Sequence, residues 1–195
     1  AAVRIVTEHQ IKNAVRASVE SAISDDQIKI AQFYLADRDI VDALVAAASR
    51  GVEIKLVLDP NKDAFGYRKN GIPNRQTGHE LVRRSDQTIK LRWYDTHGEQ
   101  FHTKLFMHES GGELKVILGS ANLTRRNLDN FNLELDIELT IDARSDTALA
   151  LNDYFERIWN NQDGLYTVEQ EAYQDDSPFK RMLYRAQERF GLSTF

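Results

Sequence analysis

The sequence contains no cysteine and no apolar run that approaches the length of a membrane-spanning helix. The absence of cysteine excludes disulfides and thiolate metal sites, and it fits any cellular compartment. No signal peptide, internal repeat or low-complexity segment is recognisable in the sequence. The chain also lacks an initial methionine: it begins Ala-Ala-Val-Arg, which favours processing or excision from a longer protein.

The charges are unevenly distributed. The 195 residues carry a net charge of −5, and 42% of them are hydrophobic and 28% charged, which is typical of one globular domain with a sizeable core. Residues 54–126 contain 13 Lys and Arg against 8 Asp and Glu, whereas residues 127–195 contain 6 against 14. A basic middle segment would attract an anionic substrate, and the overall acidity argues against duplex DNA as the main partner.

Hydrophobic periodicity predicts alternating strands and helices, and therefore an α/β domain. We predict a single domain over residues 1–195, with residues 163–195 as a helical C-terminal extension. The predicted strands are 3–7, 28–35, 52–58, 89–94, 100–108, 114–118 and 132–141. The predicted helices are 8–23, 37–48, 79–84, 145–160 and 177–190. Residues 59–78 form a long polar segment, which indicates a functional or mobile loop.

The stretch around His102 is the strongest candidate for chemistry. Side chains two residues apart on a strand point to the same face, so His102 and Lys104 should lie side by side. Such a pair suits an anionic phosphoryl group, because an imidazole can attack phosphorus or move a proton while an ammonium binds a phosphate oxygen. The next strand ends in Gly119-Ser120-Ala121-Asn122, a turn that can direct N–H groups, a hydroxyl and an amide to the same place.

This pattern resembles the signature of the phospholipase D superfamily, which is His-x-Lys, four residues, Asp, six residues and Gly-Ser-x-Asn. The matching residues are His102, Lys104, Gly119, Ser120 and Asn122. Two departures are Glu109 at the Asp position and nine following residues, the extra ones falling at an expected hairpin tip. The family also places an acidic residue, which hydrogen-bonds the catalytic His, about a dozen positions after the Asn, and Glu134 stands there. The alternative, a buried structural His beside a surface Lys, is less favoured because these residues accompany the pair.

The resemblance covers nearly the whole chain and implies an α/β/α sandwich around a mixed, mostly parallel sheet. Residues 33–38, 58–62 and 96–102 are similar to the C-terminal half of bacterial phospholipase D-like proteins that carry two motifs. In the superfamily two His-x-Lys motifs share one active site, and this chain has one. The resemblance therefore implies half of a site, completed by a missing amino-terminal domain or by a second copy. A missing domain is favoured, in which case the isolated chain should have little activity and be a monomer or weak dimer.

The resemblance further implies phosphodiester hydrolysis or phosphatidyl transfer through a phosphohistidine, without a metal or other cofactor. One His attacks phosphorus and the other protonates the leaving alcohol, and His102 leans toward the second role. Lys104 and Asn122 would stabilise charge on the phosphate oxygens, and Glu134 would orient the His102 ring. We expect a phospholipid headgroup as substrate. A nuclease and a non-catalytic half that only pairs with another domain are the alternatives.

Further candidates are weighed against ordinary structural roles. The expected substrate-binding residues are Ser120, Gly119, His97, Arg125 and Lys62. A histidine in a loop such as that of His97 is more often simply exposed to solvent. For Arg125, phosphate binding and simple exposure to solvent are equally favoured. His108 is expected to be structural, and a metal site formed by His97, His102 and Glu134 is disfavoured. The amphipathic tail 177–190 could contact a membrane surface, although docking on the core is more usual.

Overall fold

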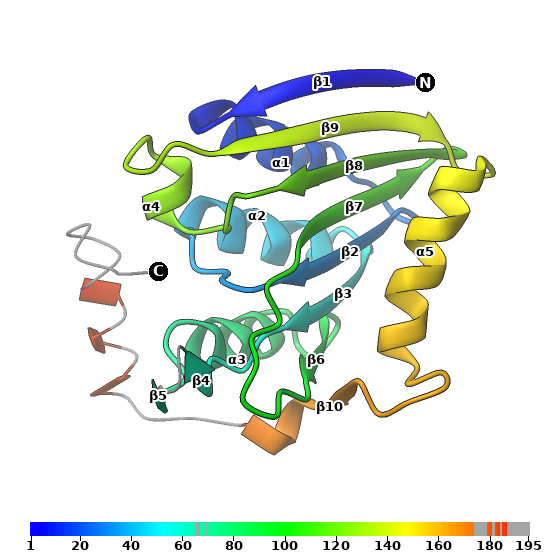
Figure 1. The fold of residues 1–195 in the computed structure, drawn as a ribbon. Helices are drawn as coiled ribbons and strands as arrows, with labels where there is room; N and C mark the ends of the chain where they lie inside the picture. Colours follow the sequence, from blue (N-terminus) through cyan, green and yellow to red (C-terminus); the bar gives the residue numbers. More distant parts are fainter. Residues whose placement is uncertain (65–66, 69, 174–178, 181, 184, 187–195) are drawn as a thin grey trace.

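A mixed eight-stranded sheet forms the centre of the protein (Figure 1), with the strand order β1-β9-β8-β7-β2-β3-β6-β10. The computed structural model describes all residues except 65–66, 69, 174–178, 181, 184 and 187–195. The strands of the sheet are β1 (Ala2–Thr7), β2 (Gln27–Gln32), β3 (Glu53–Leu58), β6 (Lys90–Tyr94), β7 (Lys104–Ser110), β8 (Glu113–Gly119), β9 (Leu135–Asp142) and β10 (Thr167–Glu169). The helices are α1 (His9–Ser21), α2 (Arg38–Ser49), α3 (Asn74–Arg84), α4 (Arg125–Leu128), α5 (Asp146–Trp159) and the short 3-10 helix η1 (Gln170–Tyr173).

The predicted α/β class with a mixed sheet is confirmed, but the balance of strand directions differs from the prediction. Parallel pairing occurs only between β2 and β3 and between β3 and β6, where α2 and α3 make the crossovers. The other described pairs of this sheet are antiparallel. The reason is that β7 and β8 form a hairpin, and the segment that contains the short helix α4 returns the chain to β9 at the same end of the sheet, so no crossover is needed.

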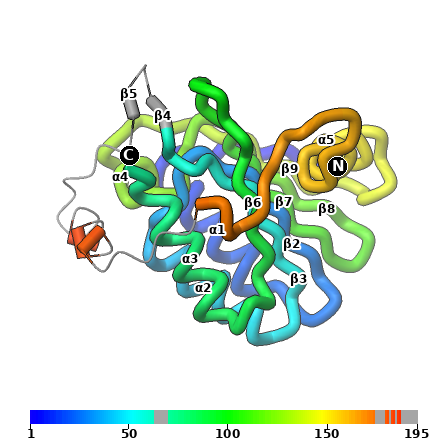
Figure 2. Tube along the Cα trace, turned by 90° about the horizontal axis from the view of Figure 1, so that it is seen from below, coloured from blue at the N-terminus to red at the C-terminus, as the bar shows by residue number. Residues whose placement is uncertain are grey.

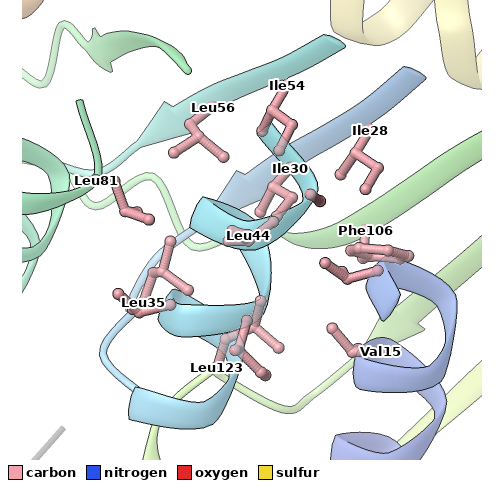
Figure 3. Close-up of a cluster of buried hydrophobic side chains, with 14 of the residues drawn as sticks. Val15, Ile28, Ile30, Leu35, Leu44, Ile54, Leu56, Leu81, Phe106 and Leu123 are labelled. Carbon is pink, nitrogen blue, oxygen red and sulfur yellow. The ribbon is translucent and has the colours of Figure 1, made fainter. Parts of the chain in front are cut away.

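Helices α1, α2 and α3 lie on one side of the sheet, apart from α5 (Figures 1 and 2). Figure 3 shows the core between these helices and the central strands, where Ile28, Ile30 and Ile54 of the sheet pack near Leu44 of α2 and Val15 of α1. Most of these side chains are fully buried. Their spacing matches the predicted periodicity, and α2 begins after Asp37, whose carboxylate accepts the Ile40 N–H as an N-cap.

The opposite face of the sheet is only partly covered. Helix α5 packs Ala148, Phe155 and Ile158 against Leu105 and Met107 of β7 and their neighbours. Beyond this cluster the same face carries the exposed side chains of Val3, Ile5, Leu135 and Ile137, and the exposed Leu133 stands two residues before β9; we call these five residues the apolar face. Leu133 is 93% exposed although it is one of the most hydrophobic residue types.

Strand β9 therefore reverses the usual arrangement. Residues 132–141 alternate apolar and polar side chains as predicted. Glu134 and Asp136, however, are buried on the face of the sheet covered by α1, α2 and α3, while Leu135 and Ile137 lie on the other face and are exposed. Asp136 is only 3% exposed. A polar interior beneath an apolar exterior costs free energy in an isolated domain, so the face has the character of an interaction surface.

Three predicted elements differ from the structure. Helix α3 begins at Asn74, so the segment predicted as a loop over 59–78 is shorter, and it contains the small hairpin of β4 (Asp63–Ala64) and β5 (Tyr67–Arg68). Residues 163–173 contribute the short strand β10 and the short 3-10 helix η1 in place of a continuous helical extension. The predicted tail helix 177–190 lies largely outside the described residues. Within the part of the chain that is described, no helix is both long and apolar enough to cross a membrane.

The buried Lys12 connects α1 to the helices around it through three carboxylates. Lys12 Nζ lies 3.0 Å from carboxylate oxygens of Asp37, Asp39 and Asp129. These partners come from the start of α2 and the end of α4, and together they raise the pKa of Lys12 against the opposing effect of its burial. These ion pairs thus hold α4, which directly follows the Gly-Ser-x-Asn turn, against α1.

Candidate functional site

The candidate site lies at one edge of the sheet, where four strands begin or end. The parallel strands β2 and β3 end there, and β7 begins at Lys104 two residues after His102. The register that pairs Leu105 with Leu118 brings the start of β7 beside the end of β8, and hence beside Gly119. Sequence-distant motif residues are therefore assembled by strand pairing, as the spacing predicted.

His102 and Lys104 are in direct contact. Lys104 Nζ lies 3.0 Å from His102 Nδ1 and also donates to the His102 backbone carbonyl at 2.9 Å. His102 itself is exposed and precedes the strand, whereas Lys104 is buried. The Phe33 ring contacts both residues: its centroid is 4.8 Å from that of the His102 ring and 5.1 Å from Lys104 Nζ.

Burial and charge both alter the protonation of this pair. Desolvation lowers the pKa of Lys104 to about 8, although the negative charges of Glu134, Asp136 and Asp59 oppose the shift. The pKa of His102 is also lowered, first by desolvation and then by the neighbouring Lys104 charge. At neutral pH the ammonium is thus mostly charged and the imidazole is poised neutral, which suits binding of a phosphate and exchange of a proton.

Hydrogen bonds with side chains of β9 and β2 hold the turn at residues 119–122 in place. Asp136 Oδ1 accepts the Ala121 N–H at 3.1 Å, and Gln32 Nε2 donates to the Ala121 carbonyl at 3.2 Å. Gly119 is required by close approach, because a Cβ there would overlap Asp136 Oδ1 and the Leu135 carbonyl. Among the described residues nothing donates to Asn122 Oδ1, which is buried.

Glu134 does not take the role that we expected of it. Its carboxylate accepts from Ser120 Oγ at 2.5 Å and from the Asn127 side-chain amide, and the partner of His102 Nδ1 is Lys104. Glu134 therefore supports the Gly-Ser-x-Asn turn and α4. Ser120, expected to bind substrate, is engaged by the same carboxylate.

The outer candidates are spread around the site and engaged elsewhere. Lys62 Nζ donates to the Thr96 carbonyl at 2.6 Å and lies over the Tyr173 ring. The exposed His97 ring lies 3.5 Å from the carboxylate of Asp95 in the same loop. Arg125 donates to Asp129 at 3.3 Å. These contacts of the three side chains are with residues other than His102.

Glu109, which stands where the superfamily signature has Asp, lies at the end of β7 away from His102 and Lys104. Glu109 lies near the far end of β7 opposite Leu114, where it contacts Asn152, and the extra residues form a two-residue turn at Gly111 and Gly112, both with positive φ. His108, also on this end of the strand, is held between Ser18 Oγ at 2.9 Å and Asp26 at 3.2 Å. It is the structural histidine that we expected.

Sequence reasoning missed Phe33, Asp59 and Asp136 as neighbours of the motif. Asp136 shares strand parity with Glu134, so its position under the turn could have been found from the same alternation. Asp59 follows a buried parallel strand, and such positions commonly reach ligand sites. No spacing signal identifies Phe33, because its contact with His102 depends on the pairing of β2 with β7.

Comparison with known proteins identifies relatives. The family model described as "Cardiolipin synthase, PLD-like domain" matches residues 3–159. Among solved structures, the phospholipase D family member Nuc from Salmonella typhimurium is 22% identical with a TM-score of 0.61, covering 82% of this chain and 94% of that one. NucT from Helicobacter pylori is 18% identical, with a TM-score of 0.60 and coverages of 82% and 97%. The phosphatidylserine synthase of Haemophilus influenzae Rd KW20 is 12% identical, with a TM-score of 0.63, covering 97% of this chain and 46% of that one. No curated protein sequence matches the chain.

Proposed function

The chain belongs to the phospholipase D superfamily, and on that premise we propose that it supplies half of a site that cleaves or transfers a phosphodiester of phospholipid headgroups. Members of the superfamily are phosphodiesterases and transferases. The observation that carries the proposal is the placement of His102 and Lys104 side by side at the edge of the sheet that also holds the Gly-Ser-x-Asn turn.

The proposed reaction has two steps, each a displacement at phosphorus. In the first, a histidine Nε2 forms a bond to phosphorus and the bond to the leaving alcohol breaks, with the second histidine giving the alcohol its proton. In the second, water or another alcohol loses a proton to that histidine and displaces the first one. Lys104 and Asn122 stabilise the charge that develops on the phosphate oxygens. His102 is assigned the proton-transfer role.

The protonation of His102 supports the view that one chain is incomplete. A nucleophilic Nε2 needs the ring proton on Nδ1, and an acidic imidazolium carries protons on both nitrogens. Either role therefore requires an acceptor for Nδ1–H, whereas a charged Lys104 can only donate. In the isolated chain Lys104 occupies this position. A productive site needs Lys104 to turn to phosphate, and it needs an acceptor that the described residues do not supply at Nδ1.

The apolar face supports the same conclusion. Ile5 pairs with Ile137 across β1 and β9, and both side chains are exposed beside the edge that holds the motif. A second His-x-Lys half placed on this face would cover it and bring a second histidine toward His102. A stable contact of this kind buries about 1,200–2,000 Å² in total. The second half is another domain or a second copy of the chain.

The description of the matching family favours a lipid substrate, because it names a cardiolipin synthase. The direct test offers phosphatidylglycerol, phosphatidylcholine and single-stranded DNA to the chain together with its second half. Release of a lipid headgroup supports the proposal, and cleavage of DNA alone would replace it with a nuclease. His102→Asn should abolish turnover, whereas full activity after this change would assign the chain a purely pairing role.

Mapping the phosphohistidine decides the role of His102. After rapid quenching with a labelled phosphodiester, the label is expected on the histidine of the other motif when the two halves differ in sequence. Label on His102 would contradict the proton-transfer assignment and make it the nucleophile.

A further inference from the structure

A buried polar network lies directly behind the His102–Lys104 pair. It consists of Asp59 after β3, Asn61 in the following loop and Asn74 at the start of α3, none of which is more than 1% exposed. Burying such groups is unfavourable unless their hydrogen bonds are made. Asn74 Nδ2 donates to the carbonyls of Phe33 at 2.7 Å and Asp59 at 2.8 Å, and Asn74 Oδ1 accepts the Leu35 N–H at 2.9 Å. The network is thus well satisfied and tied to backbone.

The network converges on Phe33. Its carbonyl accepts from both Asn61 and Asn74, and its N–H donates to the Thr103 carbonyl at 2.9 Å. These bonds fix the backbone of Phe33, from which the ring projects. That ring is the surface against which His102 packs, and Lys104 Nζ lies over it. The backbone bonds of Phe33 therefore control the placement of both motif side chains.

The Asp59 carboxylate makes the most direct link to the motif. Oδ1 accepts the Asn61 N–H at 2.6 Å, and Oδ2 accepts the Phe101 N–H at 2.7 Å. Phe101 immediately precedes His102, in a segment that is not part of β7. A short charge-assisted hydrogen bond to this N–H fixes the peptide that carries His102. This peptide lies before β7, outside the hydrogen-bond ladder of the sheet. The negative charge of Asp59 also acts on Lys104.

We propose that Asp59 and Phe33 are positioning residues for the His102–Lys104 pair: Asp59 anchors the peptide that carries His102, and Phe33 supports the imidazole and the ammonium. Neither needs to touch substrate, and both act through the motif residues. The activity part of this inference rests on the proposed function, whereas its geometric part concerns only the folded chain.

The test compares Asp59→Asn with Asp26→Asn. Asp26 is a matched control, since it is also buried, accepts a backbone N–H (that of Ile23, at 2.9 Å) and contacts a histidine, but at the far end of β7. The protonation of Lys104 is followed by NMR of lysine labelled at Cε, and the paired enzyme is assayed for turnover. We expect Asp59→Asn to move the Lys104 midpoint below about 8 and to lower kcat roughly 10- to 100-fold with little change in KM. Asp26→Asn should do neither.

A second variant, Phe33→Leu, keeps the backbone network and removes the ring. Because the ring lies 5.1 Å from Lys104 Nζ, its removal should shift the Lys104 midpoint and lower kcat, and this variant serves if Asp59→Asn fails to fold. An unchanged Lys104 midpoint and unchanged kcat in a folded Asp59→Asn or Phe33→Leu protein would overturn the inference. If the paired wild-type protein has no phosphodiesterase activity while the Lys104 midpoint still shifts in Phe33→Leu, a variant that removes no charge, the proposed function fails and the geometric part of the inference stands.

Discussion

Replacing Lys104 with methionine should stabilise the protein at neutral pH. Methionine keeps most of the length and volume of the lysine side chain and removes a charge that the buried site disfavours. The pKa of Lys104 is about 8 in the folded chain, compared with an ordinary value of 10.5. This difference corresponds to about 3 kcal/mol of destabilisation at pH 7, where the folded protein must keep the proton in a desolvated site.

The pH dependence has a definite sign. Between pH 8 and 10.5 the unfolded chain still binds the proton while the folded chain has released it, so the free energy of unfolding rises with pH. From pH 7 to pH 10 the wild-type protein should therefore gain about 2 kcal/mol relative to Lys104→Met. The variant should be the more stable protein at pH 7, and its advantage should shrink to less than about 1 kcal/mol at pH 10.

Urea denaturation at both pH values measures this double difference, with Lys90→Met as a control at an exposed lysine. Comparing variant with wild type cancels the titration of other groups. Parallel stability curves for Lys104→Met and wild type would refute the reasoning, as would a variant that is less stable at pH 7. Either result would mean that the carboxylates around Lys104 compensate its burial fully.

Three other substitutions test separate parts of the structure. Lys12→Met leaves three carboxylates without their ammonium, and denaturation should show a loss of about 3 kcal/mol. Gly119→Ala forces a Cβ against Asp136, so it should cost about 2 kcal/mol in the same assay and reduce turnover. Leu135→Lys should weaken pairing of the two halves in light scattering without unfolding the chain, whereas Leu149→Lys on α5, an equally exposed leucine outside the apolar face, should leave pairing unchanged.

The sequence was most informative where local spacing determines position. The contact of His102 with Lys104 was predictable because the two residues are two positions apart at the start of a strand. The position of Gly119 near them was predictable because β7 and β8 form a hairpin. The predicted helix 79–84 was shorter than α3, because the first two turns of α3 contain few apolar residues. Asn74 is buried through hydrogen bonds that hydrophobic periodicity does not detect.

Tertiary packing decided the features that could not be predicted. The contact of Glu134 with Ser120 depends on the register of β9 against β8, which its spacing from Asn122 does not determine. The exposure of Leu135 could not be predicted either, because alternation shows which residues share a face but not which face is covered. Helix α5 settles that point by packing on only part of the sheet.

The central claim is that one chain carries half of a phosphodiester site. The most direct measurement is the specific activity toward a chromogenic phosphodiester over a concentration series, with the molar mass followed by light scattering. We expect no turnover where the chain is monomeric. Turnover should appear with the paired species, when a second His-x-Lys half is added or the concentration is raised, and it should be lost on His102→Asn. Specific activity that is the same in the monomer as in the paired form would contradict the claim.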